Sequence, residues 1–338
     1  MSSRLAARLV VLAVFCAGAA WTLSHVDWGD LQRRVLGASA PDLALMLAAW
    51  TASLFLRPLR FQFLLCVLGP APRARYVPIW AATMLGMAVN SFTAMRAGDV
   101  VVTLLLRHRL GIEIHRSLTA IIADAFCDFV FVSLLFLTAL AFAPISAGWV
   151  GQAAPILAAA TAVAVLGIVV VVAFRRPLLG MAERLLNRLN VSWGRKLHAI
   201  AADVLTAAAA IAHWRVFLPL ILLTAMIWAV VGLSYWLGMR AVSIEPTIAS
   251  TSFVMAAITL SFVIPLGPGG LGAFEAAAVV ALSLFKVPLE AAIPFAIIAH
   301  TFQLGAALLI AGIAVTTQKI NYRDLLSAAE KRATASRS

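Results

Sequence analysis

Long apolar segments separated by short polar gaps dominate the chain. Segments with few or no charges lie near residues 5–23, 41–69, 76–95, 117–143, 150–174, 215–239, 247–266 and 290–317. An α-helix needs roughly 20 apolar residues to cross a bilayer, and these segments have about that length. The pattern therefore predicts an all-α, polytopic membrane bundle with about eight transmembrane helices.

Two shorter apolar pieces, 99–106 and 270–285, follow the third and seventh segments across breaks that contain glycine. Neither piece is long enough to predict a crossing of its own. We expect each piece to fold back on the segment before it. The pattern thus predicts two broken, re-entrant hairpins, one over residues 76–106 and one over residues 247–285.

Composition and charge agree with a membrane location. The 338 residues are 63% hydrophobic and only 12% charged, which is more apolar surface than one soluble core buries. The net charge of +12 comes from basic residues in the gaps between apolar segments, a pattern typical of residues that orient helices in a bilayer. We expect membrane lipids with anionic headgroups as partners, not nucleic acid. The cysteines show no metal-like spacing, and we predict neither a metal nor a cofactor.

Two basic regions determine the predicted orientation. Residues 175–215 hold seven Lys or Arg against two acids, and the tail 318–338 holds five against two. Both should be cytoplasmic, with residues 175–214 forming an amphipathic segment. We interpret residues 5–23 as a first transmembrane helix that is not cleaved off. Both termini are then cytoplasmic, and we expect the protein in the plasma membrane. The two hairpins then face opposite ways.

A weak internal sequence similarity relates the two predicted hairpins. A shift of 175 residues brings the apolar positions of 111–128 into step with those of 286–303, and Asp99 falls within one residue of Glu275. Three crossings lie between the copies, and an odd number inverts the second copy. We therefore predict inverted repeats at 76–143 and 247–317 inside one membrane domain, 1–317, with chance agreement between apolar helices as the alternative.

The second break has a composition that stops a helix. Prolines and glycines interrupt the apolar run in "PLGPGGLGAFE", and Glu275 follows in the first turns of the next half-helix. There the helix dipole favours a carboxylate or an anionic ligand. Unwound backbone survives in hydrocarbon only where protein or a polar cavity pairs its groups. We favour a polar cavity over a packed kink, because charge accompanies both breaks.

Three motifs stand out along the chain: "RPLRF", "NSFTAMRAGD" and "PLGPGGLGAFE", the last followed by a helix that contains His300. Together they resemble the lysylphosphatidylglycerol synthase transmembrane family, and the resemblance covers nearly the whole chain. The resemblance implies a flippase-like module that moves lipids between leaflets, here stand-alone and without the soluble aminoacyl-transferase domain. The family pattern usually has a proline where this chain has Ala94 and a basic residue where it has Ala125. The substrate of other members therefore does not transfer.

Ionisable side chains inside the apolar segments are the main candidate functional residues. Asp124 and Asp128 lie one helical turn apart, so either an arginine from elsewhere balances them or one carboxyl is protonated. The ionisable residues also have purely structural interpretations. The arginines of the second segment can snorkel to headgroups, the charges at the first break can pair with each other, and the remaining polar residues can be hydrogen-bonded core residues. The predicted substrate-binding set is Arg57, Arg60, Asn90, Arg96, Asp99, Asp124, Asp128, Gly267, Pro268, Gly269, Gly270, Glu275 and His300.

The function predicted from these residues is lipid translocation through a polar groove between the hairpins, with arginines engaging phosphate and acids balancing charge or carrying protons. One alternative is a membrane-embedded enzyme that modifies a lipid headgroup, although no nucleophile–base or metal constellation is apparent. Another is a scaffold for a second membrane protein. The cargo, the energy source and the oligomeric state, including a homo-oligomer, stay open.

Overall fold

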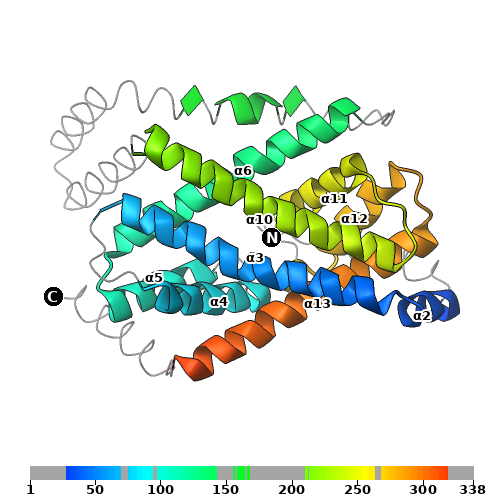
Figure 1. The fold of residues 1–338 in the computed structure, drawn as a ribbon, viewed down its shortest axis with the longest axis horizontal. Helices are drawn as coiled ribbons and strands as arrows, with labels where there is room; N and C mark the ends of the chain where they lie inside the picture. Colours follow the sequence, from blue (N-terminus) through cyan, green and yellow to red (C-terminus); the bar gives the residue numbers. More distant parts are fainter. Residues whose placement is uncertain are drawn as a thin grey trace, which may run out of the picture.

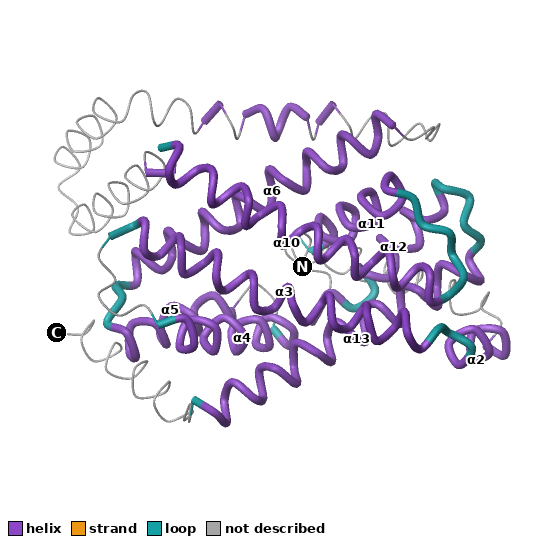
Figure 2. The backbone as a smooth tube through the Cα atoms, viewed as in Figure 1, coloured by secondary structure: helices purple, strands orange, loops and turns teal. Residues whose placement is uncertain are grey.

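The computed structural model describes residues 28–69, 75–93, 97–142, 155–156, 158–163, 166–167, 210–211, 213–262 and 268–318. Within these ranges the regular structure is helical, with no strand (Figure 2). The helices are α2 (Trp28–Leu36), α3 (Ala40–Val67), α4 (Tyr76–Phe92), α5 (Ala97–Leu110), α6 (Ile114–Phe142), α10 (Trp214–Ala241), α11 (Ile248–Ser261), α12 (Ala273–Ser283) and α13 (Leu289–Thr317), with a 3₁₀ turn η1 (Pro268–Gly270) before α12.

Four of these helices are long and apolar enough to cross a membrane. They are α3, α6, α10 and α13. The prediction of an all-helical membrane protein is therefore confirmed. The number of eight crossings and the inverted repeat stay predictions, because the segment 5–23 and most of 150–174 lie outside the described residues. The amphipathic segment 175–214 and the tail 318–338 also lie almost wholly outside them.

Both predicted helix breaks are present. α4 ends at Phe92, and α5 begins at Ala97 and packs back along α4 (Figure 1). Gly86 and Gly98 allow this close approach, because a Cβ atom on Gly98 would lie 1.8 Å from the Gly86 carbonyl oxygen. In the second hairpin α11 ends at Ser261, and α12 packs against it after η1.

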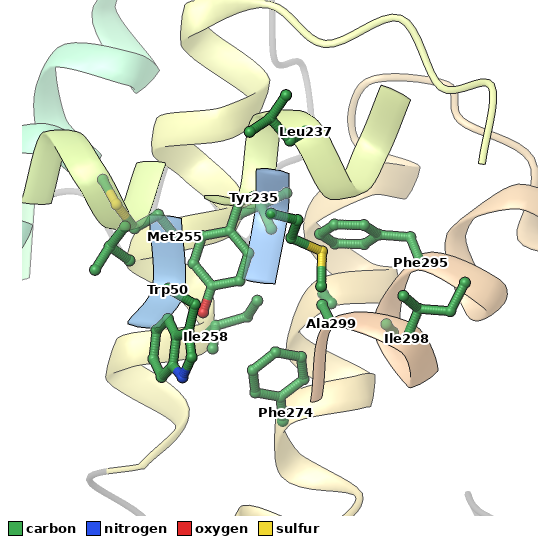
Figure 3. Close-up of a cluster of buried hydrophobic side chains, with 14 of the residues drawn as sticks. Trp50, Tyr235, Leu237, Met255, Ile258, Phe274, Phe295, Ile298 and Ala299 are labelled. Carbon is green, nitrogen blue, oxygen red and sulfur yellow. The ribbon is translucent and has the colours of Figure 1, made fainter. Parts of the chain in front are cut away.

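The long helices form the frame that holds the hairpins. α3 and α10 lie along each other in the centre of the molecule (Figure 1). Figure 3 shows how the main core joins them to α12 and α13 through the rings of Trp50, Tyr235, Phe274 and Phe295. Gly238 of α10 leaves room for this packing, because a Cβ atom there would lie 3.2 Å from the Phe295 ring. Such close van der Waals packing is what holds helices together in a bilayer.

A second apolar cluster packs α3 against α4 and α5. It contains Phe61, Leu64, Leu65, Ile79, Ala82, Val102, Leu105 and Leu106, among others. Apolar side chains also remain on the outside of the bundle, for example Leu218, Leu222 and Leu233 of α10. An apolar exterior is expected for helices that face lipid chains. The first hairpin is therefore fixed to α3, which carries Arg57 and Arg60.

Candidate functional site

Four charged side chains meet between α3 and α6. Arg60 donates from Nε to Asp124 Oδ1 at 2.8 Å and from Nη1 to Asp128 Oδ1 at 2.7 Å. Arg57 donates from Nη1 to Asp128 Oδ2 at 3.0 Å. The arginines are three residues apart on α3 and the acids four apart on α6, so each pair occupies one face of its helix. Arg57 and Arg60 thus supply the basic partner that Ala125 does not.

α10 completes this arrangement from a third side. Trp228 donates from Nε1 to Asp128 Oδ1 at 2.9 Å, and the Thr224 hydroxyl accepts from Arg60 Nη1 at 3.2 Å. The guanidinium of Arg57 lies 5.1 Å from the centroid of the Trp228 ring, within cation–π distance. We call Arg57, Arg60, Asp124 and Asp128, together with Thr224 and Trp228, the ion cluster.

The ion cluster lies deep in the bundle but is not sealed. Asp128 and Trp228 are near the midpoints of α6 and α10, which are both long enough to cross a bilayer. The Arg60 side chain is 0% exposed, whereas the side chains of Arg57, Asp124 and Asp128 are 20–25% exposed. Arg60 therefore does not snorkel to a headgroup region, since its charge ends on carboxylates. Such deep charges persist only when paired.

Two donors of the ion cluster have no acceptor among the described residues. Nε of Arg57 and Nη2 of Arg60 are both buried without a hydrogen-bond partner. A buried guanidinium N–H that finds no acceptor is costly, which makes it a ready donor for an incoming oxygen. With all four groups ionised the positive and negative charges balance. The cluster can therefore offer hydrogen bonds to a polar group without carrying a net charge itself.

The first break is held by Asn90. Its Oδ1 accepts from the Gly98 backbone N–H at 2.7 Å, and its Nδ2 donates to Asp99 Oδ1 at 3.3 Å. The side chain of Asn90 thereby satisfies a free N–H at the start of α5, and Asp99 lies in the first turn, where the helix dipole favours an acid. Arg96 lies outside the described residues.

The second break is held by Glu275 and His300. Glu275 Oε2 accepts from the Gly272 N–H at 2.7 Å at the start of α12, and Oε1 lies 2.7 Å from His300 Nδ1. His300 Nε2 lies 3.1 Å from the carbonyl oxygen of Gly269. The buried imidazole also stacks on Phe274, with ring centroids 4.4 Å apart. These contacts attach the break to α13. Gly267 lies outside the described residues.

The two breaks touch each other. Gly269 has a φ of +66°, and a Cβ atom there would lie 3.0 Å from the Ser91 carbonyl oxygen at the end of α4. Glycine is favoured at this position both by its left-handed backbone and by this close approach. η1, which contains Pro268 and Gly270, therefore packs against α4. The predicted hairpins meet at the points where their helices stop.

The structure divides the predicted residues into two groups. Arg57, Arg60, Asp124 and Asp128 belong to the ion cluster, whereas Asn90, Asp99, Pro268, Gly269, Gly270, Glu275 and His300 belong to the breaks. Thr224 and Trp228 of the ion cluster were not among the residues predicted from the sequence. Their one-turn spacing and Trp228's central position in a long apolar segment were the only signals. Within the described ranges, no three His, Cys, Asp or Glu side chains gather as they would around a metal ion.

The sequence matches the model of a protein family described as "Lysylphosphatidylglycerol synthase TM region" over residues 6–312. This match includes both helix breaks and every residue of the ion cluster. A comparison with curated proteins finds no match.

Proposed function

We propose that this chain, which belongs to the lysylphosphatidylglycerol synthase transmembrane family, moves a polar-headgroup lipid between the two leaflets of a bilayer. The observation that carries the proposal is the ion cluster, because it puts partly exposed, charge-balanced groups at mid-helix in a bundle with an apolar exterior. Ionisable groups at that depth are costly and commonly mark a substrate pathway.

The donors without acceptors suggest how a headgroup binds. A phosphate oxygen accepts from Arg57 Nε and Arg60 Nη2, which have no partner in the described part of the chain. A planar guanidinium suits phosphate, and charge-assisted hydrogen bonds of this kind are strong. Arg57 is the more accessible partner in this step, because its side chain is 24% exposed while that of Arg60 is fully buried.

The aspartates stabilise the charged arginines inside the membrane while no lipid is bound. Asp128 accepts from both arginines, so it holds their charge when no lipid is bound. A phosphate on Arg57 Nε competes with Asp128 for the charge of the same guanidinium, which limits the affinity and allows release to the other leaflet. The acyl chains stay in the bilayer against the apolar faces of the helices. We place the protein in the plasma membrane with both termini cytoplasmic.

A reconstitution experiment tests this function. The purified protein is placed in phosphatidylcholine vesicles with a trace of fluorescent lipid, and albumin back-extraction measures how fast the label crosses. Phospholipids with neutral and anionic headgroups and a polyprenyl phosphate serve as probes. We expect faster crossing for at least one class than in protein-free vesicles. No acceleration for any class would overturn the proposal, and a chemically altered lipid would point to an enzyme instead.

A further inference from the structure

Both ring nitrogens of His300 face an oxygen atom. Nε2 lies 3.1 Å from the Gly269 carbonyl, which can only accept, so Nε2 carries a hydrogen. Nδ1 lies 2.7 Å from Glu275 Oε1, and one of these two atoms must carry a proton if the contact is a hydrogen bond. Either the imidazole is doubly protonated beside a carboxylate, or a neutral imidazole accepts from a carboxylic acid.

The two arrangements contain the same number of protons and have the same net charge of zero. If the pair loses this proton, its charge becomes −1 and only one ring nitrogen keeps a hydrogen. A lone pair then opposes an oxygen at Glu275 or at Gly269, and one of the two contacts must open. The contacts at both nitrogens therefore exist together only when a proton is bound.

We propose that Glu275 and His300 form a proton-binding site that ties the second helix break to α13 and, through Gly269, to the end of α4. Binding of one proton to the neutral imidazole and carboxylate closes both hydrogen bonds. Release of the proton frees Glu275 or the Gly269 carbonyl and loosens the contact between the two breaks. The site goes beyond lipid binding, and its link to lipid movement rests on the proposed function.

Among the described residues, Glu275 and His300 are the ionisable pair at the second break, and Asp99 is the acid at the first break, where it accepts from Asn90. α11 and η1 contain no ionisable side chain, and Glu275 is the ionisable residue of α12. The Tyr235 hydroxyl of α10 donates to Gln303 Oε1 at 3.4 Å, close to one turn after His300. Other ionisable side chains described on helices that contact α13 are Arg33, Arg34, Asp42, Arg57, Arg60, Cys66, Tyr76, Arg215 and Arg240, with Glu290 on α13 itself.

One substitution imitates the protonated state. In Glu275→Gln the amide oxygen accepts from the Gly272 N–H and the amide N–H donates to His300 Nδ1, while Nε2–H still donates to Gly269. Both hydrogen bonds of His300, which we call the tie between the second break and α13, then form without a bound proton. In His300→Gln no side chain reaches both oxygens in the same way, so the tie is absent at every pH. The tie thus forms at every pH in one variant and at no pH in the other, and the native protein should lie between them.

A spin label reports the tie directly. Leu271, which is 54% exposed beside the break, is replaced by cysteine after the native cysteines Cys16, Cys66 and Cys127 are changed to alanine. The label is compared at about pH 5 and about pH 8, and we expect it to be more mobile at the higher pH in the native background. It should stay immobile in Glu275→Gln and mobile in His300→Gln. The same label at Leu289, an exposed residue at the start of α13, should not respond.

A pH-independent label in the native background, or an equal response in Glu275→Gln, would overturn the proton site. Lipid crossing is measured in the same vesicles, where we expect a several-fold faster rate at the higher pH that Glu275→Gln abolishes. If no lipid crosses at any pH, the proposed function fails, yet the spin label still decides the proton site. If lipid crosses without pH dependence while the label responds, the site exists but is not coupled to transport.

Discussion

Nη1 of Arg60 lies 2.7 Å from Oδ1 of Asp128, and this ion pair joins α3 to α6 inside the bundle. The same carboxylate accepts from Arg57 and from Trp228. One acid therefore receives donors from two helices, while Thr224 of α10 accepts from the buried arginine. Asp128 is the residue whose loss should disturb the ion cluster most.

Asp128→Asn should leave two guanidinium groups facing the single carboxylate of Asp124. Removal of one partner from a buried ion pair costs about 3–5 kcal/mol, and we expect less here because Asp128 is 20% exposed. Arg57→Gln combined with Asp128→Asn restores the balance of charge and should recover part of the loss. Thermal unfolding in detergent measures both variants, and lipid crossing should fall at least tenfold in Asp128→Asn.

A matched control for this experiment is Asp42→Asn. Asp42 lies 3.6 Å from Arg240, whose side chain is 54% exposed, so this pair contributes only about 0–1 kcal/mol. If Asp42→Asn and Asp128→Asn lower the unfolding temperature equally, the ion cluster has no special energetic role. If the double variant is no more stable than Asp128→Asn, charge balance is not what holds the cluster together.

Trp228→Phe should separate the ring from its N–H. Phenylalanine keeps an aromatic face for the Arg57 guanidinium but cannot donate to Asp128, and a hydrogen bond to a charged group contributes about 1.5–3 kcal/mol. We expect the free energy of unfolding, measured with denaturant, to fall by an amount of that order. Trp236→Phe provides the control on the same helix, because Trp236 lines a shallow apolar hollow between α10 and α11. Equal losses in both would mean that ring size alone matters.

Gly98→Ala should force α4 and α5 apart. The new Cβ would lie 1.8 Å from the Gly86 carbonyl oxygen, and this oxygen belongs to backbone that cannot yield cheaply. We expect several kcal/mol of destabilisation or failure to accumulate in the membrane. Gly312→Ala in α13 meets nothing within 4 Å and should be neutral or stabilising by up to about 1 kcal/mol, since alanine favours a helix. Unfolding midpoints of the two variants test the contrast.

Gly269→Ala should weaken the contact between the two breaks. Its control is Gly111→Ala, because both glycines have nearly the same positive φ, +66° and +67°, but only Gly269 has a close neighbour, Ser91. The left-handed backbone costs each variant about 1–2 kcal/mol. Any additional loss in Gly269→Ala measures the approach to Ser91. Equal losses would show that the breaks meet without mutual stabilisation.

Much of the helical framework could be predicted from the sequence, because the apolar segments are long and are separated by charged, glycine or proline residues. Glycine predicted both breaks, with proline at the second one only. The one-turn spacing of Asp124 and Asp128 predicted either an arginine from elsewhere or a protonated carboxyl, and the structure brings Arg57 and Arg60 to them. Apolar periodicity carries little information in a helix that is apolar on all sides. The sequence therefore did not indicate which face of α10 turns inward, and Trp228 and Thr224 were missed.

The partners at the second break illustrate a different limit. Glu275 and His300 were each singled out, one by its position after the glycines and the other as an ionisable residue in an apolar segment. Their contact joins residues 25 positions apart in two helices, and it depends on how α12 packs against α13. Local patterns contain no information about that packing. The inverted repeat stays a prediction for a related reason, since apolar helices resemble one another by composition.

The balance of charge in the ion cluster has an electrical consequence. Two arginines and two aspartates that move together as a unit carry no net charge, so a voltage across the membrane does almost no work on them, whereas each unpaired charge would contribute about 2.3 kcal/mol per 100 mV. The ion cluster itself then contributes little to any voltage sensitivity, whereas a charged cargo or the proton proposed for Glu275 and His300 would respond to the voltage. Movement of the ion cluster with an uncharged or zwitterionic lipid would therefore add almost no voltage dependence to the crossing rate.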